Sequence, residues 1–175
     1  MAFSVDFAAA YTVLAILLVC TFFTATNAIS ASLTRGYAAE LVPLADSIGD
    51  ALLKCPGEPS DWYMDPSSAR SPDIIGLSTD DPNILSIYKV DGMNLYNASA
   101  LKAALGLEDK GEQYGLRIEI NSLDGTISRT AGYPLPPDTK DVCKSIRVAT
   151  VKDQDGIYRD AAVNVYLWRK DVGAR

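Results

Sequence analysis

A single acid precedes a long uncharged stretch at the start of this chain. Asp6 is the one charged residue before Arg35, and every residue from 7 to 34 is uncharged. As a helix this stretch is about 42 Å long, more than the roughly 30 Å hydrocarbon core of a bilayer. A carboxylate beside such a segment is costly unless an opposite charge neutralises it. We therefore expect Asp6 to need a partner from outside its local sequence, which indicates an assembly.

Small and hydroxyl-bearing residues recur along the uncharged stretch. They let helices approach closely and hydrogen-bond to one another in apolar surroundings. Two other interpretations of the stretch remain, an anchor helix that faces lipid and a secretory signal with residues 7–23 as its apolar region. The signal is disfavoured because no basic residue precedes the apolar region and the helical pattern continues past the candidate cleavage region, 27–31.

Apolar residues at helical spacing continue beyond the uncharged stretch, at Leu33, Tyr37, Leu41, Leu44, Ile48 and Leu52. This spacing predicts one long helix over residues 1–54, with an apolar membrane or filament-core segment, 2–34, and an amphipathic continuation, 35–54. Pro43 is expected to kink it, and Pro56-Gly57 to follow its end. Residues 55–175 are then one globular head domain.

The pattern of the head domain turns from loop to β. Residues 83–90 predict a short strand, and residues 97–105 a short helix that Asn97 or Ser99 caps and Gly106 ends. Strand-like runs follow at 116–120, 125–129, 145–152 and 157–169, with hairpin turns at Asp124-Gly125 and Asp155-Gly156. We expect an α+β fold in which four antiparallel strands, a C-terminal β-meander, pack on the C-terminal half of the long helix.

The composition argues against enzymatic chemistry. The chain has no histidine, the commonest general base and metal ligand, and no phosphate loop, metal-binding cluster or nucleophile elbow. Its 16 basic and 22 acidic residues give a net charge of −6, which does not favour nucleic acid. Asp153, Asp155 and Asp160 lack the closing acid of a calcium-binding EF-hand loop and predict a solvated hairpin tip. No catalytic residue, metal, cofactor or small-molecule substrate is inferred.

Three other features of the head are candidates for a role. Cys55 and Cys143 form a disulfide if the domain is extracellular, or are two unrelated thiols. Asn97 begins the sequence Asn-Ala-Ser, which is an acceptor for N-glycosylation. Trp62 and Tyr63 anchor a loop by packing, or, less favoured, bind carbohydrate.

The first residues resemble a known family. Ala2, Ser4, Asp6 and Phe7 stand in the register found at the start of mature archaeal type IV pilins and archaellins, the filament subunits with class III signal peptides. Further segments, 56–62, 75–77, 83–86 and 89–90, look like the head pattern of uncharacterised archaeal pilin-like proteins. In that family a leader ending in a basic residue and Gly precedes the first mature residue, whereas Met1 alone precedes Ala2 here.

The resemblance implies a pilin-like fold and an assembly function. It implies that the helix sits in the membrane before assembly and then packs with other copies in the core of a helical, extracellular filament. It also implies that Asp6 meets the free α-amine of a neighbouring subunit, which Met1 or Ala2 would bear. The alternative is a single-pass membrane protein that displays a monomeric extracellular binding or sensor domain, and a secreted enzyme is the weakest hypothesis.

Overall fold

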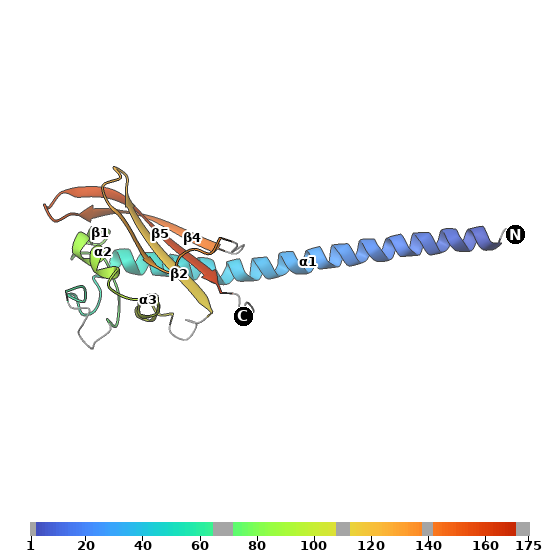
Figure 1. The fold of residues 1–175 in the computed structure, drawn as a ribbon, viewed down its shortest axis with the longest axis horizontal. Helices are drawn as coiled ribbons and strands as arrows, with labels where there is room; N and C mark the ends of the chain where they lie inside the picture. The colour runs from blue at the N-terminus through green and yellow to red at the C-terminus, as the bar shows by residue number, and fades with distance from the viewer. Residues whose placement is uncertain (1–2, 65–71, 108–112, 138–141, 171–175) are drawn as a thin grey trace. The chain divides into compact units, whose positions relative to one another are not determined.

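The computed structural model describes residues 3–64, 72–107, 113–137 and 142–170, and of residues 3–9 and 28–38 it describes the backbone alone. Its first element is α1 (Phe3–Lys54), drawn in blue to cyan in Figure 1. The predicted long helix is thus confirmed, and it continues through Pro43. The chain divides into two compact units, Met1–Ala39 and Glu40–Arg175. The last part of α1 therefore belongs to the head unit.

A five-stranded mixed sheet forms the main layer of the head unit. Neighbouring strands lie in the order β1-β4-β5-β2-β3, and every pairing is antiparallel except that of β1 with β4. The strands are β1 (Ile84–Ser86), β2 (Tyr114–Ser122), β3 (Ser128–Gly132), β4 (Val142–Lys152) and β5 (Tyr158–Arg169). Figure 1 shows the sheet curling over the last turns of α1. The fold is α+β.

The head core lies between the end of α1 and one face of the sheet. On α1 the buried side chains follow helical spacing, at Leu41, Ala45, Ile48 and Leu52. The facing strands alternate with a period of two, so that one side of each strand is buried. The buried strand residues include Leu116, Ile118, Ile120, Val163, Val165 and Leu167. The predicted packing of the helix on the sheet is confirmed.

Charged contacts hold the flank of the helix to β4. The Arg147 guanidinium lies 2.9 Å from both the Asp46 and the Asp50 carboxylates, which are one turn apart on α1. The Ser145 hydroxyl donates to Asp46 at 2.6 Å. These groups are half-exposed, so they contribute modestly to stability and mainly fix the orientation of the helix on the strand.

The predicted all-antiparallel sheet is wrong at β1. Residues 83–90, predicted as one strand, form the three-residue β1 followed at once by α2 (Ile87–Met93). Asn83 has a φ of 65°, in the left-handed region, and its peptide bridges two elements: its N–H donates to Leu53 and its C=O accepts from Thr150 of β4. This turn brings the next residues alongside β4 in the parallel direction.

Three smaller predictions have clear outcomes. Both hairpins turn at the expected Asp-Gly pairs, with φ values of 75° at Gly125 and 79° at Gly156. Because Gly125 lies in the turn, β3 begins three residues later than expected. The short helix is α3 (Ala98–Ala104), and the Asn97 side chain caps it by accepting a 2.8 Å hydrogen bond from the Ala100 N–H.

Candidate functional sites

The apolar half of α1 is the first candidate site. One window, Ala10–Asn27, is long and apolar enough to cross a membrane, with a mean hydropathy of 1.7, although a signal sequence would meet the same criteria. Ile16, Leu17, Leu18 and Val19 follow one another directly, so apolar side chains point in every direction around the helix. The large apolar side chains from Tyr11 to Phe23 are 57–72% exposed. Such a surface is stable in water only when lipid or protein covers it.

The hydroxyl groups of this segment are satisfied within the helix. Thr21, Thr24 and Thr26 each donate to a backbone carbonyl three or four residues earlier, at 2.9–3.0 Å. We expected hydroxyls to bond between helices, and these three bond within their own. Each therefore enters apolar surroundings without an unpaired donor. The segment suits either lipid or a bundle of identical helices.

The structure does not test the predicted assembly residues. Ala2 lies outside the described residues, and for Ser4, Asp6 and Phe7 the backbone is helical while the side chains are not described. Their predicted role therefore stays a prediction.

Cys55 and Cys143 are free thiols in the structure. Cys143, on β4, lies near Asp46 of α1. Burial of the thiol is the main cause of the raised pKa of Cys143, and the negative charge of Asp46 raises it further. The end of α1 instead lies near Thr150, because Asn83 bonds to both Leu53 and Thr150. Cys143 and Thr150 are seven residues apart on β4, which is about 23 Å along a strand. A disulfide requires Cα atoms within about 7 Å. The structure thus matches the alternative of two unrelated thiols, and it does not support the disulfide between Cys55 and Cys143.

Asn97 is exposed at the start of α3. Its side-chain oxygen caps the helix, which leaves the amide nitrogen, the atom that a glycan would join, facing away from this bond. The position is compatible with glycosylation, which stays a prediction.

The aromatic loop packs into the head, as predicted. Trp62 is buried, its indole N–H donates to the Gly76 carbonyl at 3.2 Å, and its own carbonyl accepts from the Tyr96 hydroxyl at 2.7 Å. Beside this loop lies Lys89, a buried cation that the sequence analysis missed. Its ammonium donates to the carbonyls of Pro56 and Ser78 at 2.6 and 2.8 Å, and burial lowers its pKa. Lys89 thus ties both ends of the loop to α2.

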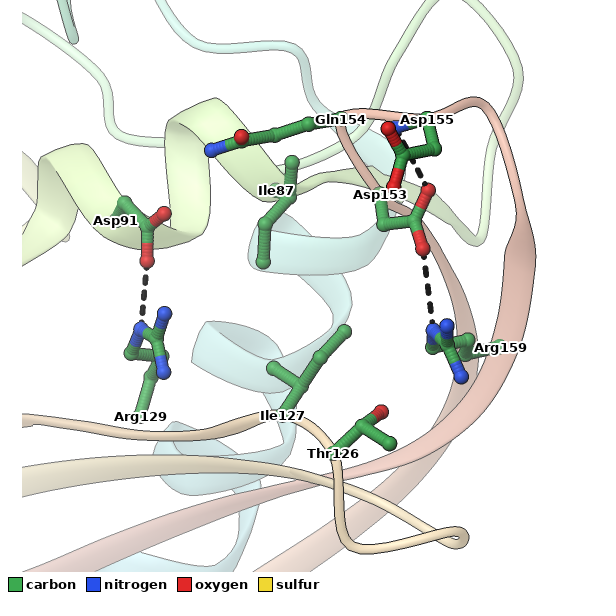
Figure 2. Close-up of a pocket in the computed structure, with 9 residues that line it drawn as sticks. All are labelled: Ile87, Asp91, Thr126, Ile127, Arg129, Asp153, Gln154, Asp155 and Arg159. Atoms are coloured by element: carbon green, nitrogen blue, oxygen red, sulfur yellow. Dashed lines mark hydrogen bonds and ion pairs between the residues drawn. The ribbon is translucent and has the colours of Figure 1, made fainter.

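A polar pocket lies where the two hairpin tips meet α2, and we call it the hairpin-tip pocket (Figure 2). Its volume is about 270 Å³. The tips lie side by side because the Leu123 N–H donates to the Asp160 carbonyl at 2.8 Å. The pocket is lined by Ile87, Asp91, Thr126, Ile127, Arg129, Asp153, Gln154, Asp155 and Arg159.

Two arginine–aspartate pairs form opposite walls of the pocket. On one side the Arg129 Nε donates to Asp91 at 2.6 Å. On the other side Arg159 donates from Nε to Asp153 at 3.1 Å and from Nη1 to Asp124, which does not line the pocket, at 2.5 Å. Figure 2 shows Ile87 and Ile127 pointing toward each other between these pairs, with Gln154 reaching from its turn toward α2. Both isoleucines are largely buried and give the pocket an apolar floor.

Hydrogen bonds within each turn fix the acids as carboxylates. The pKa of Asp124 is held far below its usual range, mainly by the hydrogen bond from the Ser122 hydroxyl. The N–H and the hydroxyl of Thr126 lower it further. The N–H of Ile157 is the main cause of the lowered pKa of Asp153, and Asp124 is the main cause of the raised pKa of Arg159. The wall formed by Arg159 therefore keeps paired, opposite charges at neutral pH.

Sequence reasoning missed this pocket. Its residues come from three separate segments, 87–91, 126–129 and 153–159, which only the fold brings together. The sequence predicts only a solvated hairpin tip at Asp153, whose observed partners are Arg159 and backbone N–H groups. Within the described part of the chain, no group of three or more Cys, Asp or Glu side chains is placed to hold a metal ion.

Comparisons of this chain with models of protein families, with curated proteins and with solved structures found no match.

Proposed function

We propose that this chain is a structural subunit of an extracellular filament of the type IV pilus class, assembled through its apolar N-terminal helix. The observation that carries this proposal is the apolar surface of Ala10–Asn27, which is exposed around the whole helix. Covering each large apolar side chain contributes about 1.5–3 kcal/mol. A filament core of parallel copies supplies such a cover outside the membrane.

The residue composition of the segment favours packing against other helices. Ala15, Cys20 and Ala25 lie among the large side chains, and small residues allow close approach of backbones. Leucine alone would serve a lipid-facing anchor equally well. The small residues therefore support a helix that packs in lipid first and against other copies later.

Asp6 supports assembly rather than a lone anchor. It stands in the pilin register with Ser4 and Phe7, next to a segment with no basic residue before Arg35. A neighbouring subunit brings an α-amine that neutralises the carboxylate, and neither charge is then buried alone. In this proposal Asp6 sets the axial register between subunits.

The head unit is built to be displayed. Its core is closed by its own residues, from Leu41 of α1 to Leu167 of β5. A head with its own core needs no partner to fold, so it sits outside the filament core and carries any surface function.

The second candidate is a monomeric membrane protein that displays the head as a binding domain. The hairpin-tip pocket favours it, because a binding domain needs a site, and the length of Ala10–Asn27 also fits a bilayer.

Shearing of the cell surface distinguishes these candidates. We expect the sheared fraction to contain thin filaments by negative-stain electron microscopy, with this chain as a principal component by mass spectrometry. Recovery of the chain only from detergent-extracted membranes, as a monomer, would contradict the filament proposal and support the anchored domain.

A further inference from the structure

We propose that the hairpin-tip pocket binds one neutral sugar unit of a glycan. The pocket lies wholly within one head unit, so this inference holds whether the head is displayed on a filament or by a single anchor. Its support comes from the charges, the unused hydrogen-bonding groups and the floor of the pocket.

The charges of the pocket favour a neutral ligand. Arg129 is already paired with Asp91. Arg159 is already paired with both Asp153 and Asp124. An anion therefore meets no unpaired cation among the described lining residues. Asp155 is the one lining carboxylate without a charged partner there, and one carboxylate is too few for a calcium ion, which takes six to eight oxygen ligands.

The unused polar groups of the pocket include both donors and acceptors. Among the described residues, the Nη2 groups of Arg129 and Arg159 make no hydrogen bond, and neither does the Oδ2 atom of Asp91. The Gln154 amide offers a further donor and acceptor, and the Asp155 carboxylate an acceptor. Each sugar hydroxyl both donates and accepts, so neighbouring hydroxyls match a guanidinium beside a carboxylate.

The pocket also suits a ring with an apolar face. Ile87 and Ile127 form a floor between the charged walls (Figure 2), against which the C–H groups of a sugar ring can pack. The volume of about 270 Å³ lies just below the range of roughly 300–1,000 Å³ for pockets that hold drug-sized ligands. This size suits one ring, with the remainder of a glycan leading out to solvent.

Binding is tested on the full-length chain in micelles of an amine-oxide detergent, which carries no sugar headgroup. The probes are the methyl α-glycosides of D-glucose, D-galactose and D-mannose, followed by saturation-transfer NMR and calorimetry. We expect at least one glycoside to bind, and we expect Gln154→Ala/Asp155→Ala to lower its affinity about tenfold, since two hydrogen-bonding groups are lost. Both residues are exposed and lie outside the head core, so the variant should fold.

A matched variant, Gln113→Ala/Asp61→Ala, removes the same two side-chain types elsewhere on the head and should leave the affinity unchanged. Three results would overturn the proposal: no glycoside binds, the pocket variant binds as well as the unaltered chain, or both variants lose affinity equally. Binding of inorganic phosphate or Ca²⁺ that the pocket variant abolishes would overturn it too, by assigning the pocket to an ion. Dispersed micelles contain no filaments, so none of these results depends on assembly.

Discussion

Asp124 holds together the turn between β2 and β3 and links it to β5. Its carboxylate accepts from the Ser122 hydroxyl at 2.6 Å, from the Thr126 N–H at 3.0 Å and hydroxyl at 2.7 Å, and from Arg159 at 2.5 Å. These bonds favour the charged form and lower the pKa of Asp124. A single acid at a hairpin tip thereby shapes one wall of the hairpin-tip pocket.

Replacing Asp124 should make the head less stable in a pH-dependent way. Because its pKa is lowered in the folded state, the stabilisation is complete above the unfolded-state pKa of about 3.9 and is lost as the pH falls toward the folded value. Asp124→Asn should therefore lower the melting temperature clearly at neutral pH and much less near pH 2. Thermal unfolding followed by circular dichroism measures this, with Asp61→Asn as the control. A difference that stays constant with pH would show that the charge of Asp124 does not matter.

At the scale of elements, the two ends of α1 are built for different surroundings. Leu52 is completely buried in the head core, whereas Leu17 is 57% exposed in the apolar segment. Both are leucines of one helix, so the same substitution can be compared in the two settings.

Leu52→Ala should lower the free energy of unfolding of the head by about 2–5 kcal/mol, the usual effect of a cavity in a packed core. Leu17→Ala should leave this free energy unchanged, because Leu17 has no place in that core. Both tryptophans, Trp62 and Trp168, are buried in the head, so their fluorescence during urea unfolding reports on the head alone. Equal losses in the two variants would contradict the division of the helix.

The elements that the sequence predicted are those with local causes. Regular spacing from Leu41 to Leu52 predicted the amphipathic end of α1, and Asp-Gly pairs predicted both hairpin turns because glycine adopts the required φ. In contrast, β1 has three residues and pairs with β4 more than 60 residues later. No pattern within three residues predicts a parallel pairing with a strand so distant in the sequence. The direction of β1 is set by the turn at Asn83, whose partners Leu53 and Thr150 are known only from the fold.

The candidate sites also differ in whether their causes are local in the sequence. The apolar segment is evident from composition, because its surface is a property of consecutive residues. The hairpin-tip pocket depends on Asp91, Arg129 and Arg159, which lie on different elements and meet only in the folded head. The two arginines near the hairpin ends were the available signal, but nothing in the sequence pairs them with particular acids.

At the scale of the whole molecule, the proposed filament depends on one charge. Asp6→Lys should abolish filaments, because a cation would repel the α-amine of the neighbouring subunit. Asp6→Glu keeps the charge and should retain filaments, which makes it the matched control. Counting filaments by negative stain, with the amount of chain in the membrane as reference, measures both. Unchanged assembly in the lysine variant would remove Asp6 from the mechanism.

The most direct test of the filament proposal is a helical reconstruction by cryo-electron microscopy of surface filaments that contain this chain. We expect Ala10–Asn27 of each copy to lie in the core, surrounded by the same segment of its neighbours, with the head outside. Filaments held together by the heads, with the apolar helices absent from the core, would contradict it.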